Sequence, residues 1–179
     1  KLSRTLIDAS ALDIEAFVLG RLSRKFAVAE ENAFLTGNGV NKPLGMFTAS
    51  DLGVPTSRDK STDNTATALT FKGLIRAKYS LKDAYRAVAQ WLFHTDALEQ
   101  LSLIQDLEGR FVWQPSVLDG QPDRLLSRPI IESRFAPNTF TASQYVGMFA
   151  DFSYYWIADS LAIKLQVLLE LYALSNQSG

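Results

Sequence analysis

The chain has 179 residues, of which 47% are hydrophobic, and its formal net charge is −1. This length and apolar content predict a folded globular protein with a real core, and they exclude a disordered tail. The absence of cysteine excludes disulfides, thiolate metal sites and cysteine nucleophiles, and the near-neutral charge argues against a general nucleic-acid binder. The sequence shows no signal-peptide pattern and no apolar run near the about 18 residues that a membrane span needs.

The first predicted element is a long amphipathic helix over residues 11–36, with Ser10 as its N-cap and Gly37 at its C-terminal end. Its apolar residues recur at helical spacing. They are Ile14, Phe17, Val18, Leu22, Phe26, Ala29 and Ala33. We expect four of them to face a sheet, so that the helix acts as a structural spine. These four are Ile14, Val18, Leu22 and Phe26.

Charged residues on the same helix are candidates for contact with a neighbouring subunit. The basic candidates are Arg21, Arg24 and Lys25, and the acidic ones are Glu30 and Glu31. A solvated helix face explains the same residues without any partner.

Two loops follow the helix. Residues 37–45 are rich in turn-forming residues, and the polar segment 51–68 is expected to be mobile. Thr70 is then the expected cap of a second helix that runs to about residue 87, followed by a short strand over 89–93.

A third helix is expected to have Thr95 as its N-cap and to close at Glu108 and Gly109. The remainder favours short strands between turns. One strand is expected to start at 111–113, and four further short strands are expected over 129–132, 145–149, 154–158 and 162–166. Residues 167–174 form an apolar stretch that fits either a buried strand or a helix. The resulting class is α+β, without internal repeats.

Three aromatic residues in succession, Tyr154, Tyr155 and Trp156, cannot all face one core if they form a strand. At least one must point outward or into an interface. We therefore add Tyr154 and Trp156 to the candidate interface residues.

Few residues of the chain are candidates for catalysis. His94 is the only histidine, so a hydrolase would have to use it, but its place between a strand and a helix favours a capping or turn role. Gly37-Asn38-Gly39 follows a helix, whereas a dinucleotide-binding loop follows a strand, so we interpret this segment as a helix stop. No catalytic, cofactor-binding or metal site is predicted.

Several short motifs follow one another along the chain. Asp13, Glu15 and Phe17 lie in the long helix, and Glu30-Glu31-Asn32-Ala33-Phe34-Leu35-Thr36-Gly37-Asn38-Gly39 is followed by Pro43-Leu44-Gly45. Further along stand LIQDLEGRF (103–111), PII (129–131) and MFADFSYYW (148–156). Taken in this order, the motifs resemble the major capsid proteins of tailed double-stranded-DNA bacteriophages. The departures are His94-Thr95 in place of an Asn-Pro step, Gln105 in place of lysine, and Ser127 and Ala150 in place of glycines.

The resemblance implies a Hong-Kong-ninety-seven-like phage capsid fold, α+β in class. In this fold a long spine helix lies on the β-sheet of a peripheral lobe, and a mixed α/β axial lobe points to the capsomer centre. The implied division is 1–68 for the spine helix and loop of the peripheral lobe, 69–160 mainly for the axial lobe, and 161–179 for the return to the peripheral lobe. It also implies a truncated fragment, lacking the N-terminal arm and extended hairpin.

The implied function is a structural subunit of an icosahedral phage or prophage capsid, with no enzyme activity and no cofactor. Its partners would be copies of itself in pentamers and hexamers, and it would contact packaged DNA non-specifically at most, with no membrane. It would assemble in the bacterial host cytoplasm and reside in the virion. The alternatives are an encapsulin-type nanocompartment shell protein and, in a different class, a hydrolase using His94.

Overall fold

The computed structural model describes residues 2–3, 14–60, 68–113, 123–158 and 177–178, and the chain forms two compact units. The first unit comprises residues 1–30 and 156–179. It holds most of helix α2 (Ile14–Thr36) and the antiparallel pair of β1 (Leu2–Ser3) with β6 (Gln177–Ser178). The predicted cap Ser10 and the predicted elements over 162–174 lie outside the described residues.

Helix α2 ends at Thr36 as predicted. The backbone N–H of Gly37 still donates to the carbonyl of Ala33 at 2.9 Å, after which the chain turns away. The apolar stripe, however, is not buried. Phe17 is 60% exposed, Phe26 46% and Leu22 37%, so the prediction that Leu22 and Phe26 lie buried against a sheet is wrong for this subunit. The stripe specified a helix, but burial also requires a facing surface.

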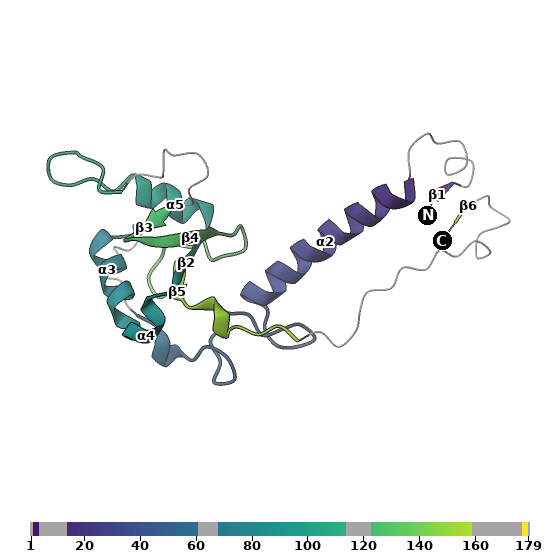
Figure 1. Cartoon of the computed structure of the whole chain (residues 1–179), viewed down its shortest axis with the longest axis horizontal. Helices are drawn as coiled ribbons and strands as arrows, with labels where there is room; N and C mark the ends of the chain where they lie inside the picture. The colour runs from purple at the N-terminus through teal and green to yellow at the C-terminus, as the bar shows by residue number, and fades with distance from the viewer. Residues whose placement is uncertain (1, 4–13, 61–67, 114–122, 159–176, 179) are drawn as a thin grey trace. The chain divides into compact units, whose positions relative to one another are not determined.

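The second unit, residues 31–155, is built on a four-stranded sheet in the order β3-β4-β2-β5 (Figure 1). Its strands are β2 (Gln90–Phe93), β3 (Arg124–Leu125), β4 (Arg128–Glu132) and β5 (Gly147–Ala150). The central strand β2 pairs in parallel with β4 and antiparallel with β5. The helices of this unit are α3 (Phe71–Ser80), α4 (Asp83–Arg86) and α5 (Thr95–Ser102), with short 3-10 turns η1 (Thr56–Arg58) and η2 (Phe152–Tyr154).

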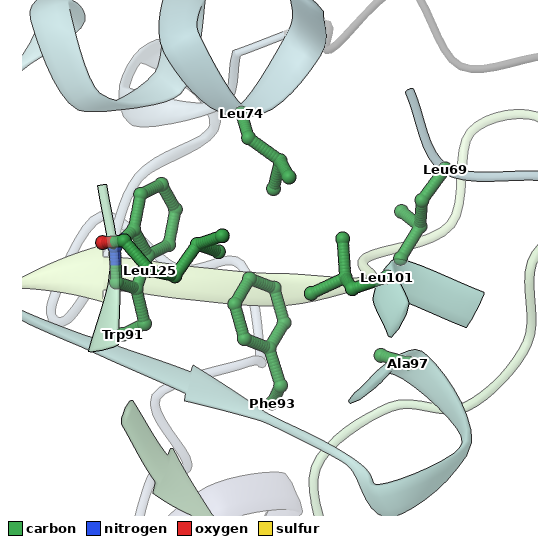
Figure 2. Packing of buried hydrophobic residues seen from close by; sticks show 7 residues of the cluster. All are labelled: Leu69, Leu74, Trp91, Phe93, Ala97, Leu101 and Leu125. Carbon is green, nitrogen blue, oxygen red and sulfur yellow. The ribbon is translucent and has the colours of Figure 1, made fainter. Parts of the chain in front are cut away.

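Strand β2 separates two hydrophobic clusters because successive side chains of a strand point to opposite faces. Trp91 and Phe93 pack on one face with Leu74 from α3 and Leu101 from α5 (Figure 2). Leu92 points to the other face, where its cluster includes Leu35, Phe47 and Ala136. The core therefore lies around one short strand and is covered by helices on the Trp91 side.

The second predicted helix is interrupted. Instead of running from Thr70 to residue 87, α3 ends at Ser80 and α4 begins at Asp83, because Leu81 is extended with φ −81° and ψ 137°. The guanidinium of Arg86 donates to the carbonyl of Leu81 at 3.1 and 3.2 Å, which satisfies a group that a continuous helix would have bonded.

Other predicted boundaries also need correction. His94 precedes α5 as its N-cap, Thr95 is the first helical residue, and the helix ends at Ser102 rather than near residue 108. The expected strand at 111–113 is only a single bridge between Gln105 and Phe111. The expected strand over 154–158 is replaced by the end of η2 and irregular backbone.

The polar loop after α2 was expected to be mobile over 51–68. Its described part, up to residue 60, has a defined path that contains η1. The carboxylate of Asp59 accepts a hydrogen bond from the Tyr145 hydroxyl at 3.0 Å. Burial, together with this carboxylate, raises the pKa of Tyr145. The mobility expected over 51–68 stays a prediction.

Candidate assembly surfaces

The charged candidates on α2 are exposed along the helix: Arg21, Arg24, Lys25, Glu30 and Glu31. The Arg21 guanidinium lies 5.2 Å from the centre of the Phe17 ring, four residues earlier and therefore on the same side of the helix. Aromatic and basic side chains thus share one exposed surface. Their role in subunit contacts remains a prediction.

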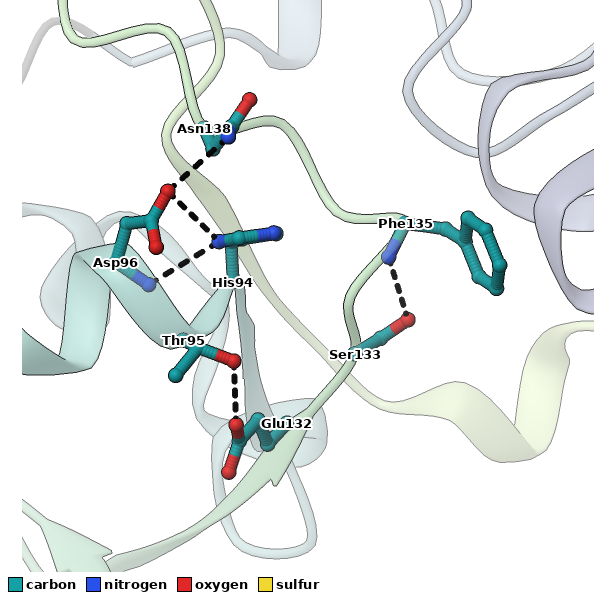
Figure 3. A network of polar contacts seen from close by, with 7 residues as sticks. All are labelled: His94, Thr95, Asp96, Glu132, Ser133, Phe135 and Asn138. Carbon is teal, nitrogen blue, oxygen red and sulfur yellow. Dashed lines mark hydrogen bonds and ion pairs between the residues drawn. The ribbon is translucent and has the colours of Figure 1, made fainter.

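Glu31 has a partner within its own unit. Its carboxylate accepts a hydrogen bond of 2.6 Å from the hydroxyl of Ser133, which is buried in the loop after β4. The same hydroxyl oxygen accepts from the backbone N–H of Phe135 at 3.2 Å (Figure 3). Nearby, Thr95 donates to the Glu132 carboxylate at 2.5 Å. Glu31 therefore fastens the C-terminal part of α2 to the end of β4, a role that sequence spacing could not reveal.

His94 acts as a cap, as predicted. Its Nδ1 accepts the backbone N–H of Asp96 at 3.1 Å and lies 3.3 Å from the Asp96 carboxylate, which also accepts from the Asn138 amide at 3.0 Å (Figure 3). An Nδ1 that accepts a hydrogen bond cannot simultaneously take a proton from a nucleophile. Among the described residues no serine hydroxyl is bonded to His94, so the geometry there lacks a serine–histidine pair.

We predict that His94→Ala will lower the free energy of unfolding by about 1 kcal/mol, because the Asp96 N–H loses its acceptor at the start of α5. His94→Asn should restore most of this stability, since asparagine is itself a good N-cap. Urea denaturation followed by circular dichroism would measure both variants. If both variants lowered the free energy of unfolding by the same amount, the capping role of His94 would be contradicted.

Two of the three successive aromatics are exposed, so at least one points outward as expected, although the segment is not a strand. Tyr155 turns inward, where its hydroxyl donates to the carbonyl of Phe34 at 3.4 Å and burial raises its pKa. Tyr154 is 68% exposed and packs edge-on against Tyr85, with ring centres 5.3 Å apart. Trp156 is 87% exposed. Tyr154 and Trp156 are therefore accessible to a neighbouring subunit.

A tight turn over residues 103–112 follows α5. The Asp106 carboxylate accepts the backbone N–H groups of Arg110 and Glu108, both at 2.9 Å, and the Arg110 side chain at 3.0 Å. The backbone hydrogen bond from Arg110 is the main cause that holds the pKa of Asp106 below its ordinary value. The ionised carboxylate therefore stabilises the turn above the ordinary pKa of aspartate, and this contribution is lost as the pH falls through the lowered value. The turn holds Leu107 fully exposed at its tip.

The described residues hold no group of three or more His, Cys, Asp or Glu side chains able to bind a metal ion. Within the same part of the chain, no helix is long and apolar enough to cross a membrane.

Comparison with known proteins identifies the family. A sequence model of the phage capsid family matches residues 1–179. Two solved structures are similar at 30% identity and a TM-score of 0.68: the capsid of an empty GTA (gene transfer agent) particle and that of a native GTA particle, each computed with C5 symmetry. The match covers 84% of this chain, and the chain spans about half of theirs, 54% and 53%.

No curated protein sequence matched the chain. The structural similarity extends over most of the chain and confirms the predicted Hong-Kong-ninety-seven-like fold, mixed in helix and sheet. With the sequence match over all 179 residues, it shows that the chain belongs to the phage capsid family.

Proposed function

We propose that this protein is a structural subunit that assembles with copies of itself into the icosahedral capsid of a phage or prophage. The observation that carries this proposal is the 30% identity to GTA capsids over 84% of the chain. Those capsids were computed with C5 symmetry, which supports a ring of five subunits as one of the assembly units. Hexamers, enclosed double-stranded DNA and assembly in the host cytoplasm belong to the same proposal.

The exposed surface fits a subunit of a larger assembly. Leu22 and Phe26 leave part of the apolar stripe of α2 open, Phe17 is exposed near the start of the same helix, and Trp156 is almost fully exposed. Large exposed apolar side chains, where they gather on one surface, often mark an interaction site. We propose that contacts between subunits use this stripe, the α2 charges and the two exposed aromatics. The residues concerned are Arg21, Arg24, Lys25, Glu30, Glu31, Tyr154 and Trp156, with Glu31 keeping its internal bond to Ser133.

The lobe assignment is part of the proposal. Residues 1–68 and 161–179 would belong to the peripheral lobe and 69–160 mainly to the axial lobe. The function is structural and not catalytic in this proposal, and the position of His94 in a helix cap supports it. The similarity to phage-like capsids favours a viral shell over an encapsulin.

The test is assembly of the full-length protein in a bacterial host. We expect negative-stain electron microscopy and light scattering of the purified protein to show regular rings or closed particles. Only monomers at every concentration, with or without the other head proteins co-expressed, would contradict the proposal.

A further inference from the structure

Helices α3 and α4 carry a basic surface, which we name the basic face. Residues 71–86 contain five basic side chains and a single acidic one, Asp83. The five are Lys72, Arg76, Lys78, Lys82 and Arg86. Exposed apolar side chains lie among them, chiefly Tyr79 (63% exposed) and Val88 (60%). Lys78 and Arg86 are both placed over the Tyr79 ring, 5.7 and 5.0 Å from its centre.

Helix α5 and the turn after it carry the opposite charge, and we name this surface the acidic face. Residues 95–110 contain Asp96, Glu99, Asp106 and Glu108 against one basic residue, Arg110. This surface also has an exposed apolar part. Leu103 is 62% exposed, Phe111 47%, and Leu107 projects fully from the turn that Asp106 holds in shape.

One exposed side chain on each face has no ion-pair or hydrogen-bond partner in the described part of the chain. These are the ammonium group of Lys82, at the start of α4, and the carboxylate of Glu99, in α5. Both charges are therefore available to a partner. Apolar side chains surrounded by charged ones are the usual composition of a protein interface.

Two different surfaces of opposite sign on one compact unit match the requirement of a ring. In a ring of identical copies each contact is heterologous, so one surface of a subunit meets a different surface of the next. A contact of either face with its own equivalent would place like charges together, which is unfavourable. We propose that the basic face of one copy binds the acidic face of the next copy around the capsomer. This inference rests on the proposed function.

A nucleic-acid backbone is the other ligand that a basic surface could take. The observations favour a second copy, because the acidic face lies on the same unit and the chain as a whole carries a net charge of −1. Part of the basic charge is also engaged internally: Arg86 pairs with Asp83 at 2.6 Å, and Lys78 donates to the carbonyl of Leu126 at 2.7 Å.

The experiment is a charge swap in the full-length protein. Lys82→Glu and Glu99→Lys should each raise the concentration needed for half-assembly about tenfold or more, because each places like charges across the contact. The double variant, which restores opposite signs, should return to within about threefold of the wild type. The matched control is Lys42→Glu, because Lys42 is exposed in the loop after α2 and lies outside both faces. Its concentration for half-assembly should stay within about twofold of the wild-type value. Sedimentation velocity would measure assembly, and thermal unfolding should confirm that all variants remain folded.

The outcomes separate this inference from the proposed function. If the wild type assembles and the single variants assemble at the same concentration, the proposed pairing of the two faces is wrong and the capsid function stands. The same holds if the double variant assembles no better than the single variants. If the single variants assemble normally and lose only retained nucleic acid, the basic face binds nucleic acid and the inference fails. A wild type that never assembles would overturn the proposed function, and this inference with it.

Discussion

Trp91→Ala is expected to lower the free energy of unfolding by about 3–5 kcal/mol, the usual cost of removing a large aromatic side chain from a core. Trp91 is 2% exposed, and its ring centre lies 4.3 Å from that of Phe149 and 5.5 Å from that of Phe93. Its indole N–H also donates to the carbonyl of Leu125 at 3.0 Å (Figure 2). Alanine would leave both a cavity and a buried carbonyl without its donor.

The matched control is the same substitution at the exposed tryptophan. Trp156→Ala should change the free energy of unfolding by no more than about 0.5 kcal/mol, because that side chain is 87% exposed. Trp91→Phe would separate the two contributions at the buried site, since it keeps an aromatic ring but removes the indole donor. Urea denaturation measures all three variants. Equal losses for the two alanine variants would contradict the assignment of the core.

Gly45→Ala is expected to cost about 2–4 kcal/mol, because a side chain at this position meets backbone rather than flexible side chains. A Cβ atom there would lie 2.5 Å from the nitrogen of Gly37 and 2.6 Å from the carbonyl oxygen of Leu35. The close approach lets Gly45 donate to the Gly37 carbonyl at 2.8 Å, and Phe47 to the Leu35 carbonyl at 2.9 Å. These bonds satisfy carbonyls at the end of α2, which has no further helical turn to bond them.

Gly20→Ala, a substitution inside α2, provides the opposite expectation to Gly45→Ala in the loop after that helix. Nothing lies within 4 Å of a Cβ at Gly20, so alanine should be neutral or should stabilise the protein by up to about 1 kcal/mol through its better helix propensity. Thermal unfolding of the two variants side by side would measure the difference. If Gly20→Ala lowered the stability as much as Gly45→Ala, the space around each glycine could not be the cause of the stability loss.

Local patterns predicted several elements well. The helical stripe and Gly37 located the C-terminal end of α2, and the apolar runs at 89–93 and 129–132 located β2 and β4 to within one residue. The capping role of His94 followed from its place between strand and helix. In each case the signal lies within a few neighbouring residues, so the chain alone specifies the outcome.

Other features depended on contacts between distant segments. The carboxylate of Glu31, for example, is bonded to Ser133 from a loop about a hundred residues later. The charges of the two proposed faces can be counted in the sequence, but only the fold shows that they stand on separate helices of one unit. The amino-acid sequence alone therefore determined the helix, the short strands and the family motifs, because these signals are local. The tertiary structure decided the strand pairing, the exposure of the α2 stripe and the surfaces left for assembly, because burial and hydrogen bonding there depend on residues far apart in the chain.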